Sequence, residues 1–205
     1  MRHYFFYILL VMGGSHKMYG QPVVEHYPAG KIRATGSLSD GQKSGEWKYF
    51  YPNGSRNAIE HYSQGLLDGT ILYFYPNDTL QGQETWRRGS MVDSAWYYHK
   101  KGTLHRKGLY KASEYEGTWT YFFQNGRVER FINYEHGQPH GPTVLFNDQG
   151  IRIQEGGYHH GLEEGEWKFY SSTGELEFIG SYKGGAPTGT WYKFVNGKRK
   201  VYKKY

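Results

Sequence analysis

A string of Gly-x-Trp followed by aromatic residues recurs along this 205-residue chain at steps of 23 to 25 residues. Copies with both glycine and tryptophan begin at Gly45, Gly117, Gly165 and Gly189, and weaker copies begin at Gly69, Ser94 and Gly141. A fixed period of this length is typical of repeat proteins, in which each unit contacts only its neighbours. The chain is therefore expected to be a row of similar units of about 24 residues rather than a globule around one core.

Each unit has the pattern of a β-hairpin. A turn sequence such as Asn53-Gly54 or Asn125-Gly126 follows the first aromatic run, and Asn-Gly tolerates the positive φ angles that hairpin turns require. Period-2 alternation places Trp47 and Tyr49 on one face of the first strand. The prediction is an all-β fold, an elongated single-layer array of antiparallel β-hairpin repeats.

The array is expected to cover residues 21–205. Its first segment, residues 21–44, is predicted to be a degenerate cap that keeps part of the repeat pattern in register. Terminal repeats of such arrays are commonly atypical, because one of their faces has no neighbouring unit to cover it.

Apolar burial must come mainly from rings, since the chain has 21 Tyr, 11 Phe and 6 Trp beside 29 Gly. We expect a structural aromatic ladder running along the array. Its predicted members are Trp47, Trp96, Trp119, Trp167, Trp191, Tyr62, Tyr134, Tyr158 and Tyr182. Rings in a row could also stack sugars or a quaternary ammonium group, so the ladder has both a structural and a ligand-binding interpretation.

Residues 1–20 differ from the rest of the chain. Arg2 and His3 precede an apolar run over residues 4–12, and small and polar residues follow. This order is typical of a secretory signal peptide, and the run is far shorter than the roughly 20 residues that span a bilayer as a helix. We expect cleavage after Gly20 and a periplasmic, surface-exposed or secreted protein.

Charge is unevenly distributed along the chain. The net charge is +6, but residues 87–111 hold seven basic residues and one acid, whereas residues 112–177 hold eleven acids and four bases. The candidate basic zone comprises Arg87, Arg88, Lys100, Lys101, Arg106 and Lys107. Such a zone could bind anionic lipid or polysaccharide. Nucleic acid is not an expected partner, because much of the excess positive charge lies in the last eight residues.

No catalytic or metal site is predicted, and no cofactor is expected. The chain has no cysteine, which excludes disulfides, thiolate metal sites and a cysteine nucleophile. His136 and His160 occupy the same slot in neighbouring units, about 10 Å apart at two strand spacings, so one ion cannot bridge them. His140 and His159 are interpreted in the same way, as loop histidines.

The spacing Tyr-x-x-Gly-x-x-x-Gly-x-Trp resembles the MORN repeat, in particular its bacterial variant. Residues 62–69, 134–141, 158–167 and 182–191 carry it. Bacterial proteins of this kind are often grouped as YwqK-family antitoxin components, and MORN arrays elsewhere are linked to membrane attachment, phosphoinositide contact and self-association. A second resemblance is to the aromatic hairpin repeats of cell-wall-binding proteins, whose units are nearer 20 residues.

The expected function is that of a non-enzymatic exported scaffold whose partner is another protein or an envelope component. The alternatives are a module that binds carbohydrate or anionic lipid, and an antitoxin-like component, which an exported chain would not suit because its toxin would be cytoplasmic. Exposed end strands also make self-association through sheet edges possible.

Overall fold

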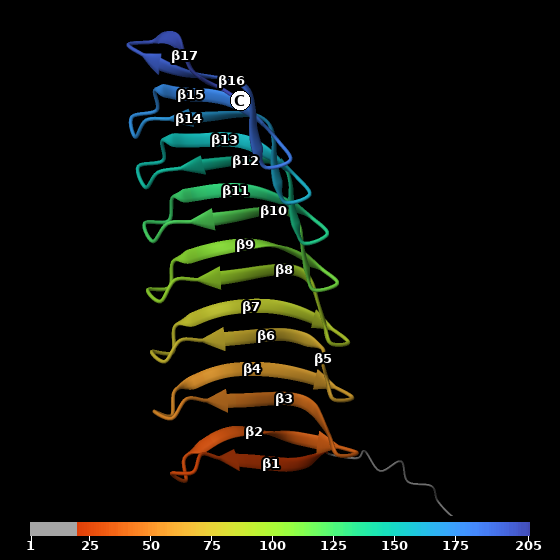
Figure 1. Cartoon of the computed structure of the whole chain (residues 1–205). Coiled ribbons are helices and arrows are strands. Elements are labelled where there is room, and N and C mark those ends of the chain that lie inside the picture. Colours follow the sequence, from red (N-terminus) through yellow and green to blue (C-terminus); the bar gives the residue numbers. More distant parts are fainter. Residues whose placement is uncertain (1–19) are drawn as a thin grey trace, which may run out of the picture.

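In the computed structural model, which describes residues 20–205, the chain is one antiparallel β-sheet of 17 strands (Figure 1). The strands are β1 Gln21–His26, β2 Ile32–Ser39, β3 Gln42–Phe50, β4 Arg56–Ser63, β5 Leu66–Leu67, β6 Gly69–Phe74, β7 Leu80–Arg87, β8 Ser90–Tyr98, β9 Leu104–Lys111, β10 Glu114–Phe122, β11 Val128–Glu135, β12 Gln138–Phe146, β13 Arg152–His159, β14 Leu162–Tyr170, β15 Leu176–Lys183, β16 Ala186–Val195 and β17 Lys198–Lys204. The predicted signal peptide lies outside the described residues, apart from Gly20. No helix that could cross a membrane occurs within residues 20–205.

The strands stack in chain order and pair antiparallel with their neighbours, with β5 and β6 both pairing with β4, so the predicted array of antiparallel hairpins is confirmed (Figure 1). The turns within units, such as residues 51–55, line one long edge, here called the hairpin edge. The turns between units, such as residues 64–65, line the other, here called the connection edge. No second layer of secondary structure covers either face of the described sheet.

The first residue of each unit adopts a left-handed backbone conformation and, in all but the last unit, pairs with the ring 17 residues further on. Gly45 has φ 69° and pairs with Tyr62; Gly117 has φ 62° and pairs with Tyr134. In the third full unit the residue with these properties is Asp93, with φ 60° and Tyr110 as its partner. The unit therefore begins at Asp93 and not at Ser94, and the seven units follow one another at a constant 24 residues.

This register corrects the predicted role of Trp96. The residue two positions after Asp93 is Ala95, which is 1% exposed and packs with Trp119. Trp96, the next residue in the strand, points to the opposite face and is only half-buried. The predicted start of this unit was aligned on Trp96, whereas the left-handed residue Asp93 sets the register. The predicted start was therefore one residue too late.

Four tryptophans of the ladder lie flat against the bare backbone of a glycine on the preceding strand. A Cβ atom on Gly36, Gly108, Gly156 or Gly180 would lie 2.1 to 2.3 Å from the ring of the tryptophan eleven residues further on. Glycine is thus required here for close approach and not for its φ angle. The rings so seated are Trp47, Trp119, Trp167 and Trp191.

The other units fill the same space in the opposite way. Where a smaller residue replaces the ladder tryptophan, a residue larger than glycine stands eleven positions before it. These pairs are Glu60 with Ile71, Glu84 with Ala95, and Ile132 with Thr143. Each pair fills the gap between neighbouring hairpins from one strand or from the other, as dense packing requires.

Hydrogen bonds at the hairpin edge also join successive units. The Tyr27 hydroxyl donates to the Phe50 carbonyl at 2.7 Å, and Tyr51 and Tyr75 donate to carbonyls 23 residues on at 2.8 Å. At the connection edge, turn amides donate to the preceding connection, as from Gly65 to Lys43 at 3.0 Å. Each hairpin is therefore bonded to the next outside the ring contacts as well.

The two end strands differ in how they discourage pairing with another sheet. β17 is exposed along its whole length and holds five basic residues in seven. β1 contains Pro22, which has no amide hydrogen for a ladder bond. Lysine and proline at sheet edges disfavour edge-to-edge pairing, so the ends of this sheet do not favour self-association.

Substituting Gly156 by alanine should destabilise the sheet by about 3 kcal/mol, because its new methyl group would overlap the Trp167 ring. The neighbouring Gly157→Ala is the matched control, since its nearest contacts would be ordinary ones at 3.5 and 3.6 Å. It should change stability by no more than about 0.5 kcal/mol. Urea unfolding of both variants measures the difference, and equal losses would contradict the packing described.

Candidate binding surfaces

The ladder tryptophans are shielded from solvent. Trp47, Trp119 and Trp167 are 1%, 0% and 1% exposed. Lys43 covers the Trp47 ring at 4.6 Å, and Tyr115 covers Trp119 at a ring distance of 4.4 Å. Rings covered in this way cannot stack on a sugar or cage a quaternary ammonium group, so their contacts serve the packing of hairpin on hairpin.

The predicted ladder tyrosines lie against these rings or next to them. Tyr62 is 6.4 Å from Trp47, Tyr158 is 5.3 Å from Trp167, and Tyr182 is 5.2 Å from Trp191. Tyr134 lies 4.9 Å from Tyr115. The four tyrosines therefore flank the tryptophan row and remain half-buried.

A carboxylate that the sequence reasoning missed takes the place of a ring between Trp47 and Trp119. Glu84 is 7% exposed and is the one buried polar side chain among the described residues. It accepts hydrogen bonds from Trp86 Nε1 at 2.9 Å and from the Tyr97 and Tyr73 hydroxyls at 2.6 and 3.2 Å. The sequence did indicate that this position is unusual, because Glu84 stands where four other units have glycine.

The tyrosines around Glu84 are held in the neutral form that donates to it. Burial raises the pKa of Tyr97 far above its ordinary value, and the hydrogen bonds to Glu84 and Tyr110 add to the effect. Burial, followed by the charge of Glu84, likewise raises the pKa of Tyr73. A buried carboxylate is stable only with such partners, because an unpaired buried charge is costly.

The predicted basic zone is not one surface. Arg87 and Arg88 lie at the connection edge, where β7 turns into β8, whereas Lys100 and Lys101 lie in a turn at the hairpin edge. The Arg106 guanidinium lies 4.4 Å from the Tyr97 ring, on the face of the sheet that carries Trp119. Lys107 alternates to the other face and pairs with Trp96. The strand reversals thus separate residues that are close in the sequence.

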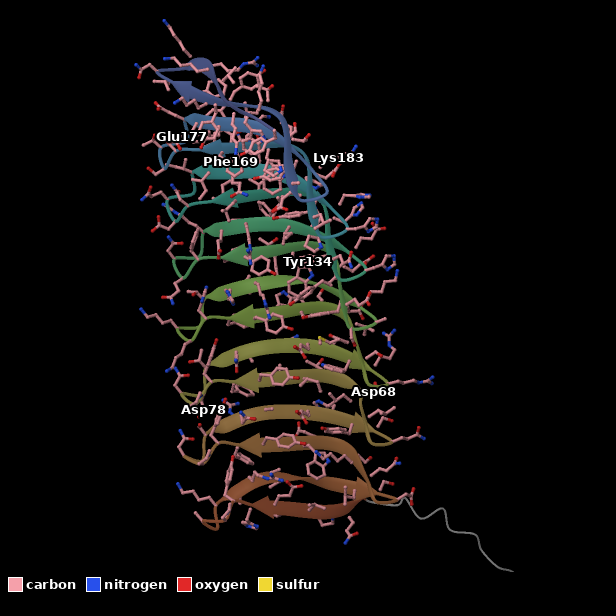
Figure 2. The ribbon with its side chains drawn as sticks, viewed as in Figure 1. Asp68, Asp78, Tyr134, Phe169, Glu177 and Lys183 are labelled. Carbon is pink, nitrogen blue, oxygen red and sulfur yellow. The ribbon has the colours of Figure 1, made fainter. Side chains whose placement is uncertain are left out.

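The connection edge has a separate pattern of charge. The connection between β7 and β8 holds Arg87 and Arg88. The next one, between β9 and β10, holds Lys111 and Glu114, and the one after, between β11 and β12, holds Glu135. All five are exposed. Figure 2 shows other charged residues on both edges, with Asp68 and Lys183 on the connection edge and Asp78 and Glu177 on the hairpin edge.

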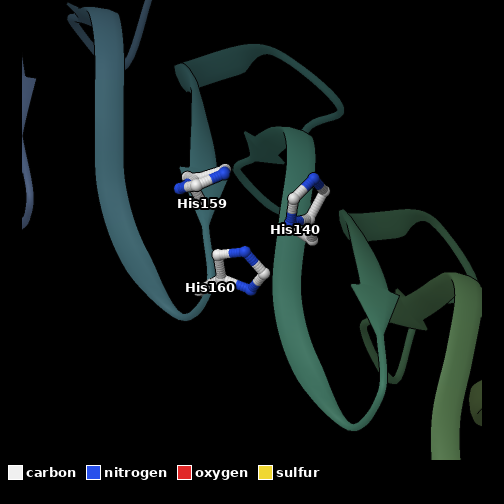
Figure 3. A group of neighbouring side chains, drawn as sticks. All are labelled: His140, His159 and His160. Carbon is white, nitrogen blue, oxygen red and sulfur yellow. The ribbon is translucent and has the colours of Figure 1, made fainter.

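The structure also brings three histidines together at the connection edge (Figure 3). One ligand atom from each of His140, His159 and His160 lies within 4.8 Å of the others. The interpretation of these residues as loop histidines did not include this proximity. The distance of two strand spacings applies to His136 and His160, but His140 and His159 are on adjacent strands.

The sequence model of the MORN repeat variant family matches residues 43–64, 67–87 and 163–183. The chain contains MORN repeats. The three matches fall within the hairpin array. The tyrosine and tryptophan of the MORN spacing make the ring contacts described above, as between Tyr158 and Trp167. Its two glycines are the turn glycine and the left-handed first residue of the next unit, as at Gly161 and Gly165. No curated protein matches the chain.

Two solved structures are similar to the MORN array at low scores. One is a chain in the crystal structure of TcdB2-TccC3-Cdc42, at 10% identity and a TM-score of 0.23, over 88% of this chain and 13% of that one. The other is a protein of unknown function from Bacteroides fragilis, at 10% identity and a TM-score of 0.13, over 90% of both chains. This chain therefore spans only a small part of the first structure.

Alkaline pH should destabilise the hairpin array through four half-buried tyrosines, which are Tyr49, Tyr73, Tyr97 and Tyr134. Their folded pKa values are raised above the value of about 10 for an unfolded tyrosine. Above about pH 10 the unfolded chain therefore binds fewer protons than the folded chain, and the free energy of unfolding falls as pH rises. Below about pH 10 this contribution is fully present.

Urea midpoints measured between about pH 8 and about pH 12 should decline only in the upper part of this range. Tyrosinate absorbance in native buffer should lag behind that of the unfolded chain. The variant Tyr97→Phe, which lacks one of the shifted groups, should show a weaker decline than the parent. Tyrosines that titrate normally in the folded chain would contradict this assignment.

Proposed function

We propose that this chain is a non-catalytic, exported MORN scaffold that binds a protein partner, or a component of the cell envelope, along its connection edge. The MORN repeats and the open hairpin sheet support the scaffold part of this proposal. The signal-peptide pattern of residues 1–20 supports export.

The observation that carries the proposal is the division between repeated and variable residues in the connections. Glycine recurs at the turn in most connections, as at Gly65, Gly89 and Gly137. The exposed residues beside it change from unit to unit, with Arg87 and Arg88 beside one turn and Glu135 beside another. A repeat protein that keeps its framework and varies its exposed positions is suited to recognition by those positions.

The order of charges along this edge favours a partner of defined polarity. In the middle of this edge, Arg87 and Arg88 come before the acidic residues Glu114 and Glu135 in the stack, and Lys111 lies opposite Glu114. A partner with acidic and basic patches in the matching order would be attracted in one orientation and repelled in the reverse one. Complementary charge of this kind speeds association and gives specificity.

The state of the buried carboxylate supports a non-catalytic protein. A general acid or base must reach the substrate atom that gains or loses a proton. Glu84 is 7% exposed and its oxygens are engaged by three donors on the chain itself. It is therefore suited to joining two hairpins and not to acting on a substrate.

Site-specific photocrosslinking in cells that naturally make the protein tests the proposal. A photoreactive residue replaces Arg88 or Lys111 at the connection edge, or Lys101 or Gln149 at the hairpin edge, which are the matched controls. We expect one discrete crosslinked species from the connection-edge positions and none from the controls. The chain purified from the same cells should begin at Gln21.

Two results would contradict the proposal. Equal crosslinking from both edges would show that the connection edge is not the recognition surface. A chain that keeps residues 1–20 and stays in the cytoplasm would contradict export, while leaving the crosslinking result to test the binding edge independently.

A further inference from the structure

Three histidines form a cluster at the connection edge of the β12–β13 hairpin (Figure 3). The ring of His140 lies 5.1 Å from that of His159 and 5.2 Å from that of His160, and the last two rings are 4.3 Å apart. His159 and His160 are exposed and His140 is partly exposed. The cluster is therefore open to an ion from solution.

The sheet register creates this cluster from separate parts of the sequence. Gly141 on β12 pairs with Tyr158 on β13, which places His140 beside His159 on the adjacent strand. His160 follows in the connection with φ 48°, a left-handed conformation that turns the chain back. His140 thus lies near the start of β12, and His159 and His160 lie at the end of β13 and directly after it.

Among the described hairpins, this one alone has histidine at all three of these positions. The preceding unit has Glu116, Glu135 and His136 there, and the following one has Glu164, Lys183 and Gly184. Neither the hairpin framework nor the turn requires histidine at these positions. Three histidines at one hairpin therefore call for an explanation beyond the fold.

A neighbouring carboxylate is placed to orient one of the rings. Glu135 Oε2 lies 3.5 Å from His140 Nδ1. That nitrogen is shielded from solvent and has no hydrogen-bond partner at shorter range. A carboxylate that accepts a hydrogen bond from Nδ1–H leaves Nε2 free for a metal, which is the usual arrangement around histidine ligands.

We propose that His140, His159 and His160 bind one borderline divalent transition-metal ion, of which Zn²⁺ is the representative. Imidazole nitrogens suit Zn²⁺, Ni²⁺ and Cu²⁺ and do not suit Mg²⁺ or Ca²⁺. Nitrogens at about 2.0–2.1 Å from a tetrahedral ion lie roughly 3.4 Å from one another. Small rotations of the two exposed side chains close the present spacing of up to 4.8 Å.

Three protein ligands leave one tetrahedral position for water or for a ligand from another molecule. The site lies at the connection edge, so a side chain of a partner bound there could occupy the open position. The metal site itself stands on the geometry of His140, His159 and His160 and does not depend on the proposed partner.

Calorimetric titration of Zn²⁺ into the full chain, produced without a histidine tag, tests the proposal. We expect one ion per chain, with Co²⁺ giving the visible absorption of a four-coordinate site. Each of His140→Ala, His159→Ala and His160→Ala should weaken binding by about tenfold or more, and Glu135→Gln by about tenfold. His136→Ala, a turn histidine of the neighbouring unit, is the matched control and should leave affinity unchanged.

Circular dichroism of the metal-free variants should match that of the parent, because two of the three side chains are exposed. Failure of the full chain to bind Zn²⁺ at about 100 µM would overturn the proposal. So would parent-like affinity in His159→Ala, or an equal loss in His136→Ala. A failed crosslinking experiment at the connection edge would leave this result unaffected.

Discussion

The contact between a tryptophan ring and the bare backbone of a glycine on the preceding strand is the interaction on which the rest of this structure depends. A single-layer sheet has no second layer to cover its apolar side chains, so each hairpin must bury its ring against its neighbour. The 2.1 to 2.3 Å approach that a Cβ would make at Gly36, Gly108, Gly156 and Gly180 shows how completely each ring fills that space. The left-handed residue at the start of each unit then sets the register that aligns ring and glycine.

The same space can be filled from either strand, which explains the units without tryptophan. Ile132 faces Thr143, and Glu84 faces Ala95, with volume moved from the later strand to the earlier one. Glu84 adds a condition, because a buried carboxylate needs donors, and tyrosines with raised pKa values supply them. The array is therefore uniform in geometry although its contacts change between units.

Much of this fold follows from the sequence, since the Gly-x-Trp period and the Asn-Gly turns specify antiparallel hairpins in a row. The error at Trp96 arose because a tryptophan is conspicuous in the sequence, while the left-handed conformation of Asp93 that sets the register is visible only in the backbone. The basic zone was separated by strand reversal. The histidine cluster was missed because cross-strand neighbours such as His140 and His159 depend on the exact pairing of β12 with β13.

A double-mutant cycle on one ring and its glycine tests the central contact most directly. The chain's own Ile132–Thr143 pair supplies the replacement, so Gly108→Ile, Trp119→Thr and the double variant are compared by urea unfolding. If ring and glycine fill one shared space, Gly108→Ile alone is strongly destabilising and adding Trp119→Thr restores part of the lost stability. Losses that simply add, with the double variant less stable than either single one, would contradict this account.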